Sequence, residues 1–416
     1  MRLPGMTEYP ASAPALASAS ALASAPAHSV ASPLPLCTTA HANRPIVMLA
    51  TAAITHDNIF TNGLYQNVYV IYRMFEAMGW IPIMIVNVKP TTLESVPWYM
   101  HDLRLMLVDD CVKSPIPVKL YIEIGMSIEP QFRSFFKLCG ARICKLYLGN
   151  ILNIDVETPM FYPKMYFAHH VIGEQDDIWV SPHYYQHSQY ARAVNHIDIE
   201  TPKPMVAPYV WDPQILTDGG KRSFSWRPPA AGAGGADTKD DVFLILEPNI
   251  SFQKCSLIPL MILEAWYRKN PTWKGRVILV NGKRLESIPF FQQTIQPTLT
   301  LQKEGRIEVR DRMDILTILK DFPSAIPLCH QWNNEYNYMV LEFFASQYPV
   351  LHNASDWKEY GYYYEGSDIA GAVTLIDRIR SSHVANLEAY KGHARALAWK
   401  HSPYNPEIQK GWAALI

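Results

Sequence analysis

Two residues near the end of the chain have the types and spacing to bind a polar ligand. Asn334 and Glu342 lie eight positions apart in the segment Cys329–Glu342, which reads as a strand, a polar turn and a helix. A helix that begins at this turn would carry Asn334 at its start and Glu342 two turns further on nearly the same face. The Glu342 carboxylate can accept hydrogen bonds through both oxygens, and the N–H groups of a helix start favour anions. A simple helix cap at Asn334 and an ordinary surface pair at Glu342 are the alternatives.

A loop near the start of the folded chain offers a second set of candidates. His56, Asp57 and Gly63 follow the predicted strand Ile46–Ala53, and ligands of open α/β sheets bind beyond the carboxyl ends of the strands. His56 or Asp57 is therefore a candidate general base, and Gly63 would let the backbone approach a ligand. Because Asp and Asn also favour turns through local hydrogen bonds, a purely structural loop is the alternative.

The adjacent pair His169 and His170 is a third candidate. Neighbouring residues of a strand point to opposite faces, and the sequence offers no third ligand beside them. The acidic pairs Asp109–Asp110 and Asp176–Asp177 lack the spacing of an Asp-x-Asp metal motif. We therefore predict no metal site.

The sequence predicts that a sheet of parallel strands positions these residues. From Pro45, apolar runs alternate with amphipathic stretches, beginning with a strand at Ile46–Ala53, a helix at Leu64–Met78 and a strand at Ile81–Val88. Such βαβ units build parallel sheets. Further predicted elements of this half are strands at Leu103–Val108, Val118–Ile124, Ala141–Tyr147 and Ile178–Val180, and a helix near Glu129–Leu138.

The alternation stops at one linker and then restarts. Residues 213–240 include a Pro-, Gly- and Ala-rich run that is typical of linkers. We predict an α/β protein with two doubly wound domains, 45–212 and 241–382, and C-terminal helices over 383–416. Residues 1–44 form an Ala-, Ser- and Pro-rich tail, predicted to be disordered. The second half contains strands at Val242–Leu246, Arg276–Val280 and Ile307–Val309, a helix at Ser256–Tyr267 and the apolar segment Ile315–Leu319.

Glu342–Val350 resembles the donor-binding motif of retaining glycosyltransferases with the GT-B fold, the glycogen-synthase-like and family 4 group. That motif carries two glutamates before a Pro-Val strand, and here Asn334 stands in the place of the first, with Glu335 one position late. Ala207–Pro213 stands where the family crosses into its second domain. The short segments His-Gln-Trp, Leu-His-Asn and Gly-Tyr-Tyr-Tyr also resemble those of a proteobacterial family described only as a domain of unknown function.

The resemblance implies an architecture and a substrate class. In the GT-B plan, two Rossmann-like domains face a central cleft, and C-terminal helices cross back to the first domain. The co-substrate would be a nucleotide-sugar such as a UDP- or GDP-sugar, with no cofactor and no metal. The donor would lie on the second domain, and a glycan, lipid-linked or other hydroxyl acceptor near the first loop.

The resemblance also implies residue roles. Glu342 would bind the ribose hydroxyls of the nucleotide, while Asn334 and Glu335 would reach the transferred sugar or the diphosphate.

Asn249 and Lys254 have the spacing of an arginine and a lysine that hold the diphosphate in the family, although the arginine is absent here. Lys283 would add positive charge, and either His169 or His170 would contact the sugar. Without the arginine and the first glutamate, the donor and the choice between retention and inversion stay open.

Composition fits a cytoplasmic enzyme. The 416 residues are 49% hydrophobic, enough for large cores, and the formal net charge of -1 gives no electrostatic reason to expect binding to nucleic acid or to an anionic membrane. The six cysteines contain no Cys-x-x-Cys pair, which is typical of reduced thiols. No apolar run approaches the roughly 18 residues of a membrane span.

The sequence therefore favours a glycosyltransferase of the hexosyltransferase type. Two alternatives use the same fold: a non-catalytic protein that binds a glycan or a nucleotide, and a nucleotide-sugar epimerase or phosphorylase-like enzyme. Turnover of a nucleotide-sugar distinguishes the enzymes from the binding protein.

Overall fold

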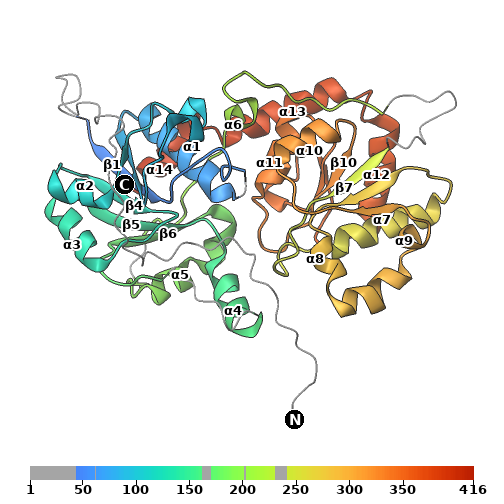
Figure 1. The fold of residues 1–416 in the computed structure, drawn as a ribbon, viewed down its shortest axis with the longest axis horizontal. Coiled ribbons are helices and arrows are strands. Elements are labelled where there is room, and N and C mark those ends of the chain that lie inside the picture. The colour runs from blue at the N-terminus through green and yellow to red at the C-terminus, as the bar shows by residue number, and fades with distance from the viewer. Residues whose placement is uncertain (1–43, 61, 162–169, 201–202, 230–240) are drawn as a thin grey trace, which may run out of the picture.

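The computed structural model describes residues 44–416 except 61, 162–169, 201–202 and 230–240. Figure 1 shows two α/β domains side by side, one built from the first half of the chain and the other from the second half. Each domain contains a six-stranded sheet, and the strand pairs of both sheets are parallel. The predicted α/β class with two doubly wound domains is confirmed.

The first sheet has the strand order β3-β2-β1-β4-β5-β6. Its strands are β1 (Ile46–Thr51), β2 (Ile81–Val86), β3 (Leu105–Met106), β4 (Leu120–Glu123), β5 (Arg142–Tyr147) and β6 (Asp177–Val180). Its helices are α1 (Gly63–Ala77), α2 (Val108–Lys113), α3 (Pro130–Leu138), α4 (Ile151–Phe161) and α5 (Ser188–Val194). Val47 and Leu49 of β1 pack in the core that contains α1, whereas Met48 and Ala50 pack on the opposite face with α2 and α3. This is why β1 is apolar at successive positions rather than alternating.

The second sheet has the order β12-β11-β10-β7-β8-β9. Its strands are β7 (Val242–Ile245), β8 (Arg276–Leu279), β9 (Ile307–Val309), β10 (Ile326–Leu328), β11 (Leu351–His352) and β12 (Tyr362–Tyr363). Its helices are α7 (Leu257–Lys269), α8 (Lys283–Glu286), α9 (Thr300–Lys303), α10 (Ile315–Asp321) and α11 (Tyr338–Ala345). Phe243 of β7 packs against Trp266 and Trp273 in the largest hydrophobic core of the molecule.

The crossover and the last helices tie the two domains together. After α6 (Gln214–Thr217), the Trp226 indole donates a hydrogen bond to the Ala325 carbonyl at 3.1 Å, so this part of the predicted linker already packs on the second domain. Helices α12 (Ile369–Ser382) and α13 (Leu387–Lys400) cover the second domain. Helix α14 (Pro406–Ala413) returns to the first, where Trp412 is fully buried against Phe75 and Trp179. The predicted return of the C-terminal helices is confirmed.

Several element boundaries differ from the sequence expectations, and those of β3 and α11 are two examples. The strand expected at Leu103–Val108 is only two residues long, and a helix begins at Val108. Helix α11 begins at Tyr338 rather than at Asn334, because Asn337 supplies the cap: its side chain accepts a hydrogen bond from the Met339 N–H. The prediction of Asn334 as the first residue of the helix was therefore wrong.

Candidate functional site

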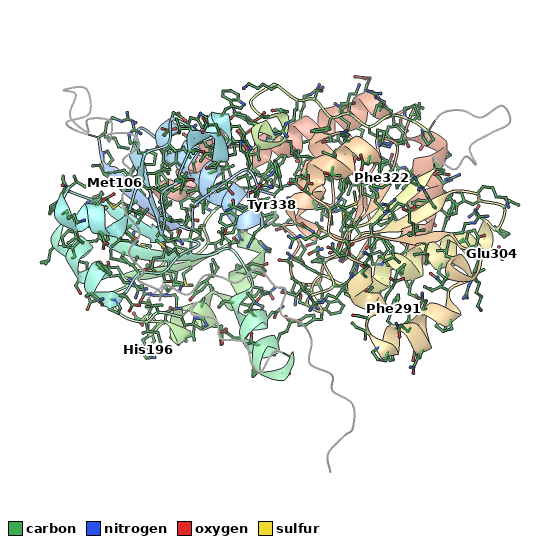
Figure 2. All side chains as sticks on the ribbon, viewed as in Figure 1. Met106, His196, Phe291, Glu304, Phe322 and Tyr338 are labelled. Carbon is green, nitrogen blue, oxygen red and sulfur yellow. The ribbon has the colours of Figure 1, made fainter. Side chains whose placement is uncertain are left out.

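The carboxyl ends of the two sheets face each other, and the seam between the domains is filled by side chains. Figure 2 shows Tyr338, the first residue of α11, at the junction of the two domains. A Cβ atom on Gly63 would lie 1.9 Å from the Tyr338 ring, so only glycine fits here. The close approach that the sequence predicted at Gly63 is thus made by the other domain.

Glu342 lies in the same seam. It is only 5% exposed, and its carboxylate accepts a hydrogen bond of 2.9 Å from the side-chain amide of Gln66 in α1. Burial raises the pKa of Glu342 to about 7, and the bond from Gln66 opposes the rise. A carboxylate with one protein donor retains free acceptor capacity.

Asn334 joins the two domains through a chain of hydrogen bonds. The Tyr184 hydroxyl of the first domain donates a hydrogen bond to the side-chain carbonyl of Asn334. The side-chain amide of Asn334 donates in turn to the side-chain carbonyl of Gln331 at 2.7 Å. The Gln331 amide in turn donates to Glu247, which also accepts from the His330 N–H at 3.1 Å. The chain therefore connects the first domain to a carboxylate buried at the end of β7.

Glu247 and Lys254 form an acid–base pair on the loop between β7 and α7. Glu247 is fully buried, and its burial raises its pKa to about 7. Burial of the nearby Lys254 ammonium lowers the pKa of that group. Lys254 is part-buried, and its side chain makes no hydrogen bond or ion pair with the described residues. A desolvated cation without a direct partner suits the binding of an anionic ligand.

His183 of the first domain lies within electrostatic reach of Lys254. It lies in the turn Pro182–His187 beyond β6, and its ring packs on Tyr184 and Tyr336. Burial and the Lys254 charge lower its pKa, so the imidazole is neutral. Its Nδ1 is buried without a hydrogen-bond partner among the described residues. His183 was not among the candidates selected from the sequence.

Asn249, predicted to help hold a diphosphate, instead holds its own loop. Its side-chain carbonyl accepts from the Ser256 N–H at 2.9 Å, and its amide donates to the Glu247 carbonyl at 3.0 Å. Its φ of 54° is left-handed, a conformation that asparagine tolerates better than arginine. An arginine at this position would have to adopt the same left-handed backbone, at a higher cost.

The two remaining candidates of the second domain lie at the border of the site. Lys283 is exposed at the start of α8 and forms an ion pair with Asp311. Glu335 is part-buried, and burial raises its pKa. Neither side chain lies in the hydrogen-bond chain through Asn334.

In the first domain, His56 and Asp57 are exposed and line a cavity, whereas His170 bonds within its own domain. The His170 ring contacts Asp155 at 2.8 Å and the Tyr147 hydroxyl at 3.1 Å. His169 lies outside the described residues. His183, in contrast, packs against Tyr336 of the second domain. Among the described residues, no group of three or more His, Cys, Asp or Glu side chains is arranged to hold a metal ion.

Sequence reasoning missed Glu247, His183 and Gln66. Glu247 could have been found, because it follows a predicted strand directly and so falls at the carboxyl end of a sheet. His183 and Gln66 carry no such signal, since their roles depend on the approach of the other domain.

Residues 48–416 match the family described as "Protein of unknown function (DUF2827)". The chain belongs to the DUF2827 family. Among curated proteins, no sequence matches this DUF2827 protein. No helix in the described ranges is long and apolar enough to cross a membrane.

Solved structures with a similar fold are glycosyltransferases. One from Rickettsia africae ESF-5 is 13% identical over 90% of this chain and 99% of its own, with a TM-score of 0.51. The trehalose-6-phosphate synthase OtsA is 11% identical over 88% and 98%, with a TM-score of 0.55. An α-glucosyltransferase in complex with UDP and a 13-mer DNA is 10% identical over 90% and 100%, with a TM-score of 0.56. These similarities establish that this DUF2827 protein has the GT-B fold.

Proposed function

We propose that this protein is a glycosyltransferase that moves a sugar from a nucleotide-sugar to a hydroxyl-bearing acceptor. One observation carries the proposal: Lys254, which follows β7 of the second domain, lies within electrostatic reach of the neutral His183, which follows β6 of the first. Ligands of α/β sheets bind beyond the carboxyl ends of the strands, and the GT-B fold supports this chemistry by analogy.

The donor would lie on the second domain. Lys254 would neutralise the diphosphate, on which negative charge grows as the bond to the sugar breaks. Glu342 would accept hydrogen bonds from the ribose hydroxyls, and Asn334 would contact the sugar or the diphosphate. Because Gln66 and Tyr338 occupy the seam in this structure, binding requires the domains to move apart.

The transfer follows from these positions. The acceptor oxygen bonds to the anomeric carbon as the bond between that carbon and the leaving phosphate oxygen breaks, and the acceptor proton passes to that phosphate oxygen. The free Nδ1 of His183 would accept a hydrogen bond from a sugar hydroxyl and orient the ring. Because the leaving phosphate oxygen also takes the acceptor proton, the acceptor attacks from the face of the leaving group, and the proposed transfer proceeds with retention. The scheme requires no metal, because Lys254 supplies the positive charge.

Thermal unfolding with a panel of nucleotides and nucleotide-sugars tests the proposal. A ligand that binds only the native state at about 100 times its dissociation constant stabilises it by about 2.7 kcal/mol, which raises the melting temperature by several degrees. We expect such a shift for one donor class in the wild type and in Lys320→Met, an exposed lysine of α10. The shift should disappear in Lys254→Met. A shift that persists in Lys254→Met, or no shift with any nucleotide, contradicts the proposal.

A non-catalytic binding protein is the second candidate. It is favoured by the side chains of Asn249 and Asn334, whose hydrogen bonds to their own protein occupy the places of an arginine and a glutamate. Nucleotide-sugar that binds without release of its nucleotide, across a panel of acceptors, would support this candidate over the transferase.

A further inference from the structure

A cavity of about 300 Å³ lies at the seam, and its lining does not include the Lys254 loop. Four parts of the chain form its wall: the loop after β1, the turn at Pro97 and Tyr99, the crossover at Asp218 and Arg222, and the start of α10. Its volume is at the small end of the range for ligand sites, roughly 300–1,000 Å³. A sugar unit fits this volume, whereas a duplex does not.

Tyr99 shows that the cavity is suited to a polar ligand. Tyr99 is only 6% exposed and packs edge-on against Tyr69, yet its hydroxyl has no hydrogen-bond partner among the described residues. The hydroxyl lies within the electrostatic reach of Asp218 and Arg222, which line the same cavity. This hydroxyl is not among the buried polar atoms of the described residues, so it is open at the cavity wall and can exchange a hydrogen bond with a ligand.

The charged residues of the wall define the kind of ligand. Asp57, Asp218 and Asp314 contribute three carboxylates, and Arg222 contributes one guanidinium. Asp218 and Arg222 lie 3.7 Å apart, and Asp314 accepts a 3.0 Å hydrogen bond from the Thr317 N–H as the cap of α10. Asp57 is exposed, with no side-chain hydrogen bond to the described residues. The wall remains negative even if His56 is protonated, so it repels phosphates and carboxylates.

Apolar surface completes the wall. Phe60, Pro97 and Leu316 line the cavity beside the carboxylates. Aromatic and aliphatic faces pack against the C–H faces of a sugar ring, while carboxylates accept hydrogen bonds from its hydroxyls. This mixture suits a hydroxyl-rich ligand without negative charge.

We propose that this cavity binds the acceptor, and that the acceptor presents an uncharged sugar rather than a phosphate-bearing lipid, an acidic sugar or a nucleic acid. The inference rests on the proposed transferase function and names its second substrate class. Phe60 packs against the hydrophobic cores of both domains. Because both domains contribute to the wall, the cavity is complete only when they are together, and acceptor binding would therefore favour the closed arrangement.

A ligand-observed NMR titration of the full chain tests the proposal. The probes are glucose, galactose and N-acetylglucosamine, compared with glucose 6-phosphate and glucuronate, each with and without the nucleotide that gives the largest thermal shift. We expect the uncharged sugars to bind and the two anions not to bind. Tyr99→Phe removes one hydroxyl and keeps the ring, so it should weaken binding about 3- to 10-fold. Asp57→Asn should weaken it about 10-fold, since hydrogen bonds to charged groups are stronger.

Asp109→Asn is the matched control, because it removes an exposed carboxylate from α2, outside the cavity, and should leave sugar binding unchanged. Equal binding of anionic and uncharged sugars overturns the proposal, as does wild-type affinity in Tyr99→Phe and Asp57→Asn, or no sugar binding by the folded protein. Nucleotide binding without sugar binding overturns this inference alone. Sugar binding that depends on Tyr99 and Asp57, without nucleotide binding at all, overturns the transferase function and with it the role of the sugar as acceptor.

Discussion

Each domain has a buried carboxylate near the carboxyl end of a central strand, with a cation beside it. The two pairs differ in how many hydrogen-bond partners the cation has. In the first domain, Arg133 donates to both oxygens of Glu123 at 2.8 and 2.9 Å, and both residues are at most 1% exposed. The Ile128 N–H and the Gly173 carbonyl complete their hydrogen bonds. In the second domain, Glu247 has hydrogen-bond donors, but Lys254 makes no direct contact with it.

The difference separates a structural pair from a binding site. A bidentate arginine–carboxylate pair satisfies both ions and leaves nothing to offer a ligand. A lysine that is desolvated without a contacting anion is poised to take one from outside. Burial alone therefore does not identify the functional charge, whereas an incomplete set of partners does.

The largest expected effect comes from breaking the complete pair. Arg133→Ala leaves the Glu123 carboxylate buried without its cation, which should lower the free energy of unfolding by about 3–5 kcal/mol. Urea denaturation followed by circular dichroism measures the loss. A loss below about 1 kcal/mol would show that the pair is not what holds this edge of the sheet together.

An intermediate effect is expected at Glu342. Its folded pKa of about 7 lies above its usual value of 4.5, so the stability it contributes is present below pH 4.5 and is lost as the pH rises through 7. Glu342→Gln removes this pH-dependent loss of stability, because an amide does not ionise. The amide oxygen of the new side chain can still accept the hydrogen bond from Gln66. The variant should match the wild type at pH 4.5 and exceed it at pH 8, on the order of 1–3 kcal/mol, since one pKa unit corresponds to about 1.4 kcal/mol. Denaturation at the two pH values measures the difference, and a gain that does not depend on pH would contradict the prediction.

The smallest effect sharpens the comparison. Lys254→Met removes a cation that has no direct partner, so the free energy of unfolding should change by less than about 1 kcal/mol, in contrast to Arg133→Ala. Because Lys254 lowers the pKa of Glu247, the variant should also raise that pKa above its present value of about 7. Carboxyl NMR signals followed over a pH titration report the shift. A destabilisation as large as that of Arg133→Ala would show that Lys254 is structural.

Prediction from sequence succeeded where short-range patterns decide the outcome. The strand pattern at Ile46–Ala53 and the restart at Val242 gave both sheets, because runs of apolar residues need cover on both faces. It failed at the turn before α11, where Asn334 and Asn337 are both acceptable caps. Only the packing of Asn334 against Tyr184 and Gln331 assigns the cap to Asn337.

In the candidate site, too, some features follow from local sequence patterns and others only from tertiary packing. Asn334, Glu342 and Lys254 lie near the first domain, because they belong to loops and a helix that follow strands of the second sheet. His170, one of the two histidines proposed to contact the sugar, bonds to Asp155 and Tyr147 within its own domain. His183 was not among the sequence candidates, and its ring packs against Tyr336 of the second domain.

The sequence alone determined the two parallel sheets, their order along the chain and the loops that carry polar residues, since these follow from local periodicity. The tertiary structure alone decided which of those residues are partners. Gln66 and Glu342 are 276 positions apart, and Tyr184 and Asn334 are 150 apart. No local pattern encodes such contacts, because they exist only when two separately folded sheets bring their carboxyl edges together.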